Sequence, residues 1–203
     1  MAVLRLGFVH IRVTDMQDAV KHYRDTLGMK VMAEDGGKIY LKAWDEFDHH
    51  SLVLEEGGVG LVKLGYKVES DDDLAQIEQR AQQFGGGVQR VSAGENLKVG
   101  EAVACTLPSE QRIEFYKDAE LVGTETGDLN PHAWPRDMVG VGVPAVDHAL
   151  IAAEDPLSVE RWWKEVVDFY AVERVVTEQG PNEQLIGTWL SCAQKAHDIA
   201  IIG

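Results

Sequence analysis

The sequence is poor in cysteine and in positive charge. Its 203 residues contain two cysteines, Cys105 and Cys192, and neither belongs to a CxxC pair or a cysteine–histidine cluster. This usage is typical of a reducing compartment, and we expect a cytoplasmic protein without structural disulfides. Only 19 lysines and arginines stand against 34 aspartates and glutamates, for a net charge of −15. Nucleic acids and anionic membranes need a basic surface, so neither is expected as a partner, and the acidity indicates solubility.

Long apolar runs are also missing. No stretch approaches the ~18 apolar residues of a membrane helix. The first residues, MAVLRLGFVHIRV, alternate apolar with polar side chains and do not form the apolar core of a secretory leader. GxSxG, HExxH and Walker motifs are absent from the sequence, and GGVGLVKLG carries only two glycines of a dinucleotide fingerprint, so we expect a loop there.

The sequence contains one pattern of predicted secondary structure that occurs three times. A short strand is followed by an amphipathic helix, a glycine-rich turn and further strands, which predicts βαβββ modules. The expected helix starts are Thr14, with Gln17 completing a capping box, then Ser70, and then Asp155 followed by Pro156. The expected buried stripes are Met16, Ala19, Val20, Tyr23 and Leu27, then Leu74, Ile77, Ala81 and Phe84, then Val159, Trp162, Trp163, Val166 and Val167.

The first and third segments match each other closely enough to indicate an internal duplication. His10 and His148 both stand early in a first strand, and His50 and His197 both precede a last apolar run. We therefore predict an α+β fold of tandem βαβββ modules forming mixed-sheet barrels. The expected domains are 1–120 with two paired modules, a Gly- and Pro-rich linker over 121–144, and 145–203 as the first half of a C-terminal domain. The third module has no sequence partner, so the C-terminal barrel is expected to be incomplete.

His148 raises a separate question. Within VPAVDHALIA, strand alternation puts Val146, His148 and Leu150 on one face. An ionisable ring on an apolar face is either a satisfied core histidine or a ligand, and the residues alone leave both open.

Beyond these patterns, the stretches VHIRV, DHALI, NPHAWPRD and WLSCAQKAHDIAII resemble the extradiol ring-cleaving dioxygenases, in the catechol 2,3-dioxygenase group of the vicinal-oxygen-chelate superfamily. The resemblance implies a mononuclear Fe(II) held by two histidines and one carboxylate, with open positions for catechol and O₂. It implies extradiol cleavage of catechol or a substituted catechol to a yellow ring-opened semialdehyde. It also implies a homo-oligomer.

Position by position, the resemblance makes His148 the first metal ligand and His197 a catalytic acid/base histidine outside the coordination shell. The family's other two ligands would lie beyond residue 203. Asp168 stands at a helix end where the family usually has glycine, and aspartate tolerates the left-handed conformation at small cost. The positions that match the substrate-binding wall are Leu150, Trp189 and Ile202.

In the first two modules, His10 and Glu114 stand where repeat logic would place metal ligands, but Gly65 and Tyr66 stand where the second histidine would fall. These positions are therefore interpreted as structural relics without metal. The remaining histidines, His49, His50 and His132, are expected at solvated or edge positions.

Two other functions stay open. A non-catalytic module of the same superfamily could bind a small aromatic molecule between paired βαβββ units, although such a binder has no need of His148 and His197. A metal-dependent isomerase or lyase of the superfamily is disfavoured, because its modules usually carry a carboxylate that the third module lacks.

Overall fold

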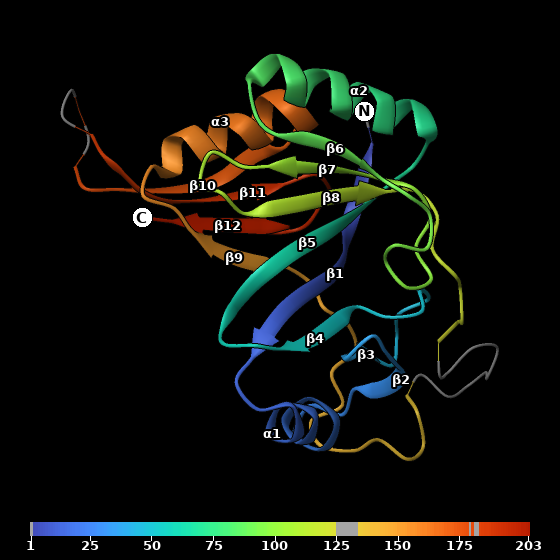
Figure 1. Ribbon diagram of the computed structural model, residues 1–203. Coiled ribbons are helices and arrows are strands. Elements are labelled where there is room, and N and C mark those ends of the chain that lie inside the picture. Colours follow the sequence, from blue (N-terminus) through green and yellow to red (C-terminus); the bar gives the residue numbers. More distant parts are fainter. Residues whose placement is uncertain (1, 125–133, 179, 181–182) are drawn as a thin grey trace.

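The computed structural model describes residues 2–124, 134–178, 180 and 183–203, and all three predicted βαβββ modules are present (Figure 1). The first module comprises β1 (Val3–Val13), α1 (Met16–Val20) with a π-helical continuation η1 (Lys21–Thr26), β2 (Lys30–Asp35), β3 (Lys38–Lys42) and β4 (Leu52–Glu56). The second comprises β5 (Gly60–Val68), α2 (Asp71–Phe84), β6 (Val88–Val91), β7 (Ala102–Thr106) and β8 (Arg112–Tyr116). The third comprises β9 (Ala149–Ala152), α3 (Pro156–Val167), β10 (Tyr170–Val176), β11 (Leu185–Ser191) and β12 (Ile199–Ile202).

The strands form two mixed sheets with one repeated pairing rule. In each module the first strand pairs in parallel with the last, as β1 with β4, β5 with β8 and β9 with β12, and the other neighbours are antiparallel. An antiparallel β1–β5 seam joins the first two modules into an eight-stranded sheet, ordered β2-β3-β4-β1-β5-β8-β7-β6. The third module forms its own sheet, ordered β10-β11-β12-β9. The α+β class and the mixed sheets are as predicted, but both sheets are open rather than closed barrels.

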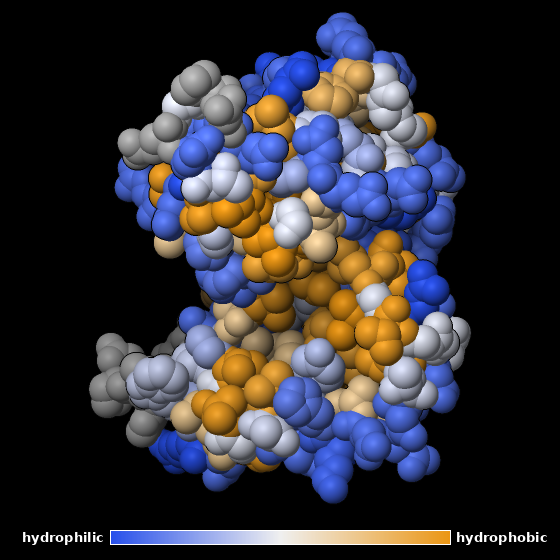
Figure 2. All heavy atoms as spheres, turned by 90° about the vertical axis from the view of Figure 1, so that its left-hand side faces the viewer, coloured by the Kyte–Doolittle hydropathy of each residue, from blue (hydrophilic) through white to orange (hydrophobic). Residues whose placement is uncertain are grey.

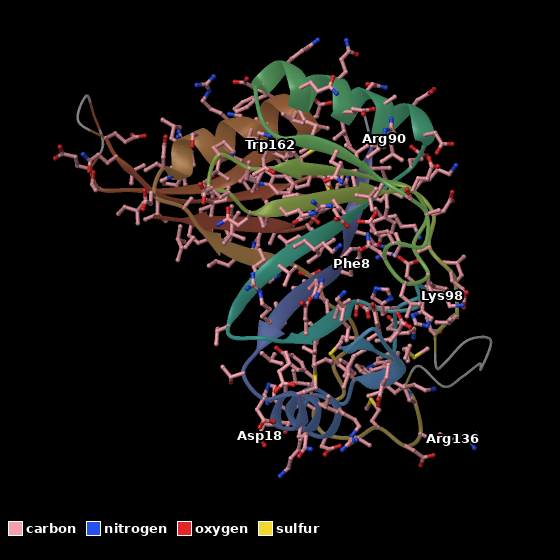
Figure 3. All side chains as sticks on the ribbon, in the orientation of Figure 1. Phe8, Asp18, Arg90, Lys98, Arg136 and Trp162 are labelled. Atoms are coloured by element: carbon pink, nitrogen blue, oxygen red, sulfur yellow. The ribbon has the colours of Figure 1, made fainter. Side chains whose placement is uncertain are left out.

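The main core lies between the second and third modules. Helices α2 and α3 lie side by side over the two sheets, and Trp162 projects from α3 toward them (Figures 1 and 3). Tyr66 and Phe115 from the second module meet Trp162 and Trp163 in one aromatic cluster, and all four side chains are fully buried. Burying each such side chain contributes about 1.5–3 kcal/mol. The third module is thus packed against the second on its helical side, a contact that the sequence did not predict.

Two of the three helix starts are as predicted. The Ser70 side chain accepts a hydrogen bond from the amide of Asp73, whose carboxylate bonds back to the Ser70 amide, and Asp155 caps α3 with Pro156 as its first residue. Thr14 is not the first cap: Asp15 takes that place, and its carboxylate accepts from the amide of Asp18. An ionised carboxylate is a stronger cap than the threonine hydroxyl, which explains the one-residue shift.

Most of the stretch GGVGLVKLG is a strand, not the predicted loop: residues 60–65 belong to β5, and only residues 57–59 lie outside it. Residues 60–65 form the first two thirds of β5, which pairs with β1 on one side and with β8 on the other. Its glycines concealed the alternation of apolar and polar side chains on which sequence reasoning relies. In the part of the chain that the structure describes, no helix is long and apolar enough to cross a membrane. Much of the predicted linker, including His132, lies outside the described residues.

Candidate active site

His148 stands immediately before β9, not inside a strand as the alternation had suggested. Its side chain is 45% exposed, so it is not a core histidine. Its Nδ1 lies 2.9 Å from Oδ2 of Asp147. An ionised carboxylate only accepts hydrogen bonds, so Nδ1 carries the proton and donates it, which leaves the Nε2 lone pair available as a ligand. The hydrogen bond from His148 lowers the pKa of Asp147, which keeps that carboxylate ionised.

His197 lies beside His148. The parallel pairing of β9 with β12 sets Ala149 opposite Ile199, which brings together the two segments that precede these strands. The centroids of the two imidazole rings are 4.2 Å apart, with an angle of 67° between the ring planes. The structure therefore brings together the residue predicted as a metal ligand and the residue predicted as an acid/base group.

The predicted substrate-binding residues share one face of the third sheet. Leu150 lies opposite Ala200, which lies opposite Trp189, so these three form a row across β9, β12 and β11. Ile202 lies two residues along β12 from Ala200 and therefore points to the same side.

The burial of the neighbouring residues shows that this row lies on the face of the third sheet that points away from the core. Ile151 and Ile201, which alternate with the row, are buried in the core beneath α3, whereas Leu150 is 55% exposed. On the side of the molecule where β9–β12 lie, Figure 2 shows hydrophobic surface gathered around a hollow. The candidate site is thus a pair of histidines at one end of an open apolar sheet face, a surface suited to a flat ring.

The residues around the histidines include two that sequence reasoning missed, Lys195 and Asp198. Asp198 is fully buried, and its Oδ2 accepts hydrogen bonds from the Ser191 hydroxyl and the Cys192 amide. Lys195 lies between Asp198 and Asp147, 3.0 Å from an oxygen of each carboxylate. The only sequence signal was their place in KAHDIA, next to His197.

The described residues do not assemble a complete metal site. A non-haem Fe(II) site of the expected type needs two imidazoles and one carboxylate close enough together to bind the same ion. No group of three histidine, cysteine, aspartate or glutamate side chains close enough to hold a metal occurs in the described ranges. Of the described residues, His148 suits one ligand position.

The first module carries a counterpart of the histidine pair, and its register corrects one predicted equivalence. Val9 lies opposite Leu52, as Ala149 lies opposite Ile199 in the third module. Counting back from these pairs, His50 matches His197, but Phe8 and not His10 matches His148. The Phe8 and His50 rings lie 5.7 Å apart, so the contact is kept while the ligand is replaced.

The same register places Phe8, Gly65 and Glu114 in one row across β1, β5 and β8. A Cβ on Gly65 would come within 2.1 Å of Phe8 Cε1, so the phenyl ring occupies the space where a side chain at position 65 would begin. Neither a phenyl ring nor a glycine offers a nitrogen atom to a metal, so two of the three positions in this row cannot supply a ligand. The interpretation of the row as a relic stays a prediction.

The third residue of that row, Glu114, has its negative charge balanced by neighbouring side chains of the same chain. Glu114 is fully buried, and it accepts from Lys63 at 3.1 Å, Asn96 at 2.7 Å and Arg112 at 2.8 Å. Burial alone would raise the pKa of Glu114, but these donors outweigh it and lower that pKa. The Lys63 ammonium and the Arg112 guanidinium together provide the positive charge beside this carboxylate.

The predicted exposure of His49 and His50 is wrong. Both are buried, with their Nδ1 atoms 3.2 Å apart, and His50 packs between Phe8 and Tyr40. Burial, with His49 beside it, lowers the pKa of His50 to about 3. His10 is buried as well, and burial lowers its pKa to about 4 although its Nε2 lies 2.9 Å from Glu55.

Comparison with known proteins places this site in context. Residues 63–120 match the family model of the catechol 2,3-dioxygenase-like N-terminal domain. The chain is 36% identical, over 98% of its length, to a metapyrocatechase of Pseudomonas sp. (strain CF600), and spans 65% of that relative. It is 24% identical to a manganese-dependent 2,3-dihydroxybiphenyl 1,2-dioxygenase of Geobacillus genomosp. 3, of which it spans 64%.

Solved structures agree. The 2,3-dioxygenase LapB from Pseudomonas sp. KL28 superimposes with a TM-score of 0.91 at 34% identity, covering all of this chain and 70% of LapB. A variant of homoprotocatechuate 2,3-dioxygenase from B. fuscum superimposes with a TM-score of 0.83 over 54% of its chain, at 24% identity, which supports the fold alone. The chain belongs to the extradiol dioxygenase family that includes the catechol 2,3-dioxygenases.

Proposed function

We propose that this chain takes part in the extradiol cleavage of catechol or a substituted catechol with O₂, giving a 2-hydroxymuconic semialdehyde. The observation that carries the proposal is the His148–His197 pair, with ring centroids 4.2 Å apart at one end of an open apolar sheet face. Neither a pure binding module nor a structural protein needs two such histidines there. The related enzymes likewise favour catalysis over the non-catalytic alternative.

The proposed cofactor is Fe(II), with His148 as one ligand and the other two supplied from outside the 203 residues. A bound metal of this kind holds the diol and O₂ in contact and assists electron flow between them. One relative is named as manganese-dependent, so Mn(II) is the competing cofactor to be tested.

The chain's own residues have two proposed roles. His197 holds and moves a proton near the substrate, a task for which an imidazole side chain is suited at neutral pH. Leu150, Trp189 and Ile202 bind one face of the ring and exclude water from it, because apolar side chains in a row gain free energy by covering a flat apolar ligand.

The setting is also a proposal. We propose a homo-oligomer in the cytoplasm, with residues 1–120 as an N-terminal domain, 121–144 as a linker and 145–203 as part of the catalytic domain. The exposed apolar side chains of β10, Tyr170, Val172 and Val175, are consistent with further burial on assembly.

The test is direct. A longer version of this polypeptide, which supplies the other two proposed ligands, is loaded anaerobically with Fe(II), or in parallel with Mn(II), and catechol and air are added. We expect oxygen uptake and a yellow product with one metal, both abolished in His148→Ala. A correctly folded chain that consumes no oxygen with either metal contradicts the proposed activity for these residues.

A further inference from the structure

The side chain of Lys195 bridges the backbone positions next to both site histidines. Its Nζ donates to the Asp147 carbonyl oxygen at 2.8 Å and to Asp147 Oδ1 at 3.0 Å, and it lies 3.0 Å from Asp198 Oδ1. Asp147 directly precedes His148, and Asp198 directly follows His197. One ammonium group therefore connects the start of β9 to the loop that leads into β12.

The two ends of this bridge differ in how firmly they are held. Asp198 is fully buried, and its second oxygen is fixed by the Ser191 hydroxyl at 2.8 Å and the Cys192 amide at 2.9 Å. Asp147 is 65% exposed. Among the contacts described for the Asp147 carboxylate, one oxygen faces Lys195 and the other faces His148. Asp198 is thus the buried anchor, and Asp147 is the exposed end that Lys195 contacts.

We propose that Lys195 is a positioning residue that acts on His148 through Asp147. By holding the Asp147 carboxylate against Nδ1, it keeps the proton on Nδ1 and the lone pair on Nε2, the atom that a metal would take. Partners that orient a ligand histidine in this way typically change metal affinity or activity by about 10- to 100-fold when removed. The role in catalysis rests on the proposed function, whereas the effect on His148 does not.

The experiment measures the tautomer of His148 directly. Long-range ¹H–¹⁵N correlation spectra of the uniformly ¹⁵N-labelled chain, without metal at about pH 8, where an ordinary imidazole is neutral, show which ring nitrogen of each histidine is protonated. His148 is assigned by its loss in His148→Gln. The variants are Lys195→Met, Lys195→Arg and Asp147→Asn. Lys117→Met is the matched control, because Lys117 also lies near two aspartates, Asp71 and Asp118, but on the second module.

We expect the parent chain to show the Nδ1–H form of His148. Lys195→Met and Asp147→Asn should shift it toward a mixture with the Nε2–H form. Lys195→Arg, which can still reach both carboxylates, should restore the Nδ1–H form, and Lys117→Met should leave it unchanged. An unchanged tautomer in folded Lys195→Met, or in Asp147→Asn should the lysine variant not fold, overturns the proposal.

Oxygen uptake with catechol, measured in the longer version of the polypeptide that supplies the other proposed ligands, separates this proposal from the proposed function. A shifted tautomer together with a 10- to 100-fold lower rate in Lys195→Met supports both. A shifted tautomer in a chain whose parent consumes no oxygen keeps the positioning role and rejects the activity. An active parent whose Lys195→Met variant keeps both rate and tautomer rejects the positioning role alone.

Discussion

His148 and His197 contact each other edge to face, with ring centroids 4.2 Å apart, although 48 residues separate them in the sequence. The parallel β9–β12 pairing creates this contact, because it sets the first residues of both strands side by side. Nδ1 of His148 lies 2.9 Å from the Asp147 carboxylate, which fixes the orientation of this ring. Under the proposed function, His148 would be the metal ligand and His197 would exchange protons.

Replacing His197 tests that division of tasks. Because His197 is partly exposed and lies outside the core, His197→Asn should leave the free energy of unfolding nearly unchanged. If it serves as the acid/base group, the turnover number for oxygen uptake should fall by about 10²- to 10⁴-fold. His22→Asn, at an exposed position on η1, is the control and should keep full activity. Equal rates in both variants would remove His197 from the mechanism.

The sequence predicted most of the fold because the modules repeat and their helices are capped in standard ways. Ser70 and Asp155 begin their helices as expected, and the stripe around Trp162 is buried as expected. The failures have local causes. A carboxylate replaced Thr14 as a cap, and the glycines of β5 hid a strand whose partners lie far away in the sequence.

The site was predicted less completely than the fold. The resemblance selected His148 and His197, and the register brought them together. The resemblance could not select Lys195, because its proposed positioning role depends on contacts with both Asp147 and Asp198. These two residues come close together only when β9 pairs with β12. The internal repeat also selected His10 over Phe8, because the two histidines match in sequence whereas the match of Phe8 to His148 is visible only in the strand register.

Acid should destabilise the fold before the carboxylates titrate. The pKa of His50 is about 3 and that of His10 about 4 in the folded chain, against an ordinary value near 6.5. As the pH falls below 6.5 the unfolded chain therefore binds protons that the folded chain does not, and stability is lost toward pH 4. Each such histidine contributes a slope of up to about 1.4 kcal/mol per pH unit.

Urea unfolding between pH 7 and 5 measures this slope. In this range His49, which also has a lowered pKa, adds to the effect, while most carboxylates stay ionised. His50→Phe, which keeps a ring between Phe8 and Tyr40, should reduce the slope, whereas His22→Asn should not. A slope that His50→Phe leaves unchanged would mean that His50 is protonated in the folded chain.

Lys63 should stabilise the fold through Glu114. Lys63→Met leaves a fully buried carboxylate with Asn96 and Arg112 but without its ammonium, and should cost about 1–3 kcal/mol of unfolding free energy. Adding Glu114→Gln should recover part of that loss, because the neutral amide no longer requires a cation. Thermal and urea unfolding of the two single variants and the double variant give the coupling, and strict additivity would contradict the proposed pairing.

Asp168 tests the left-handed end of α3. It has φ 59° and ψ 26°, and it forms an exposed ion pair with Arg80 at 2.6 Å. Asp168→Gly loses this pair but removes the steric cost, so urea unfolding should shift by no more than about 1 kcal/mol in either direction. Asp168→Val should lower stability by about 1–2 kcal/mol, because a branched Cβ clashes in this conformation. Similar stabilities for the two variants would show that the helix end relaxes freely.

Gly65 and Phe8 should be strongly coupled. Gly65→Ala places a Cβ within 2.1 Å of the Phe8 ring, and overpacking of this kind costs about 1–3 kcal/mol. Phe8→Ala removes a nearly fully buried ring that also contacts Tyr116 and His50, at a cost of about 3–5 kcal/mol.

In the double variant the new methyl group enters space that the ring has left, so the combined loss should be smaller than the sum of the two. Urea unfolding of the four proteins closes this cycle. Gly7→Ala provides a comparison, because its Cβ would meet the Tyr116 hydroxyl and not Phe8, so its cost should remain when Phe8 is truncated. Additive losses for Gly65→Ala and Phe8→Ala would mean that the Phe8 ring does not occupy the space of a Cβ at position 65.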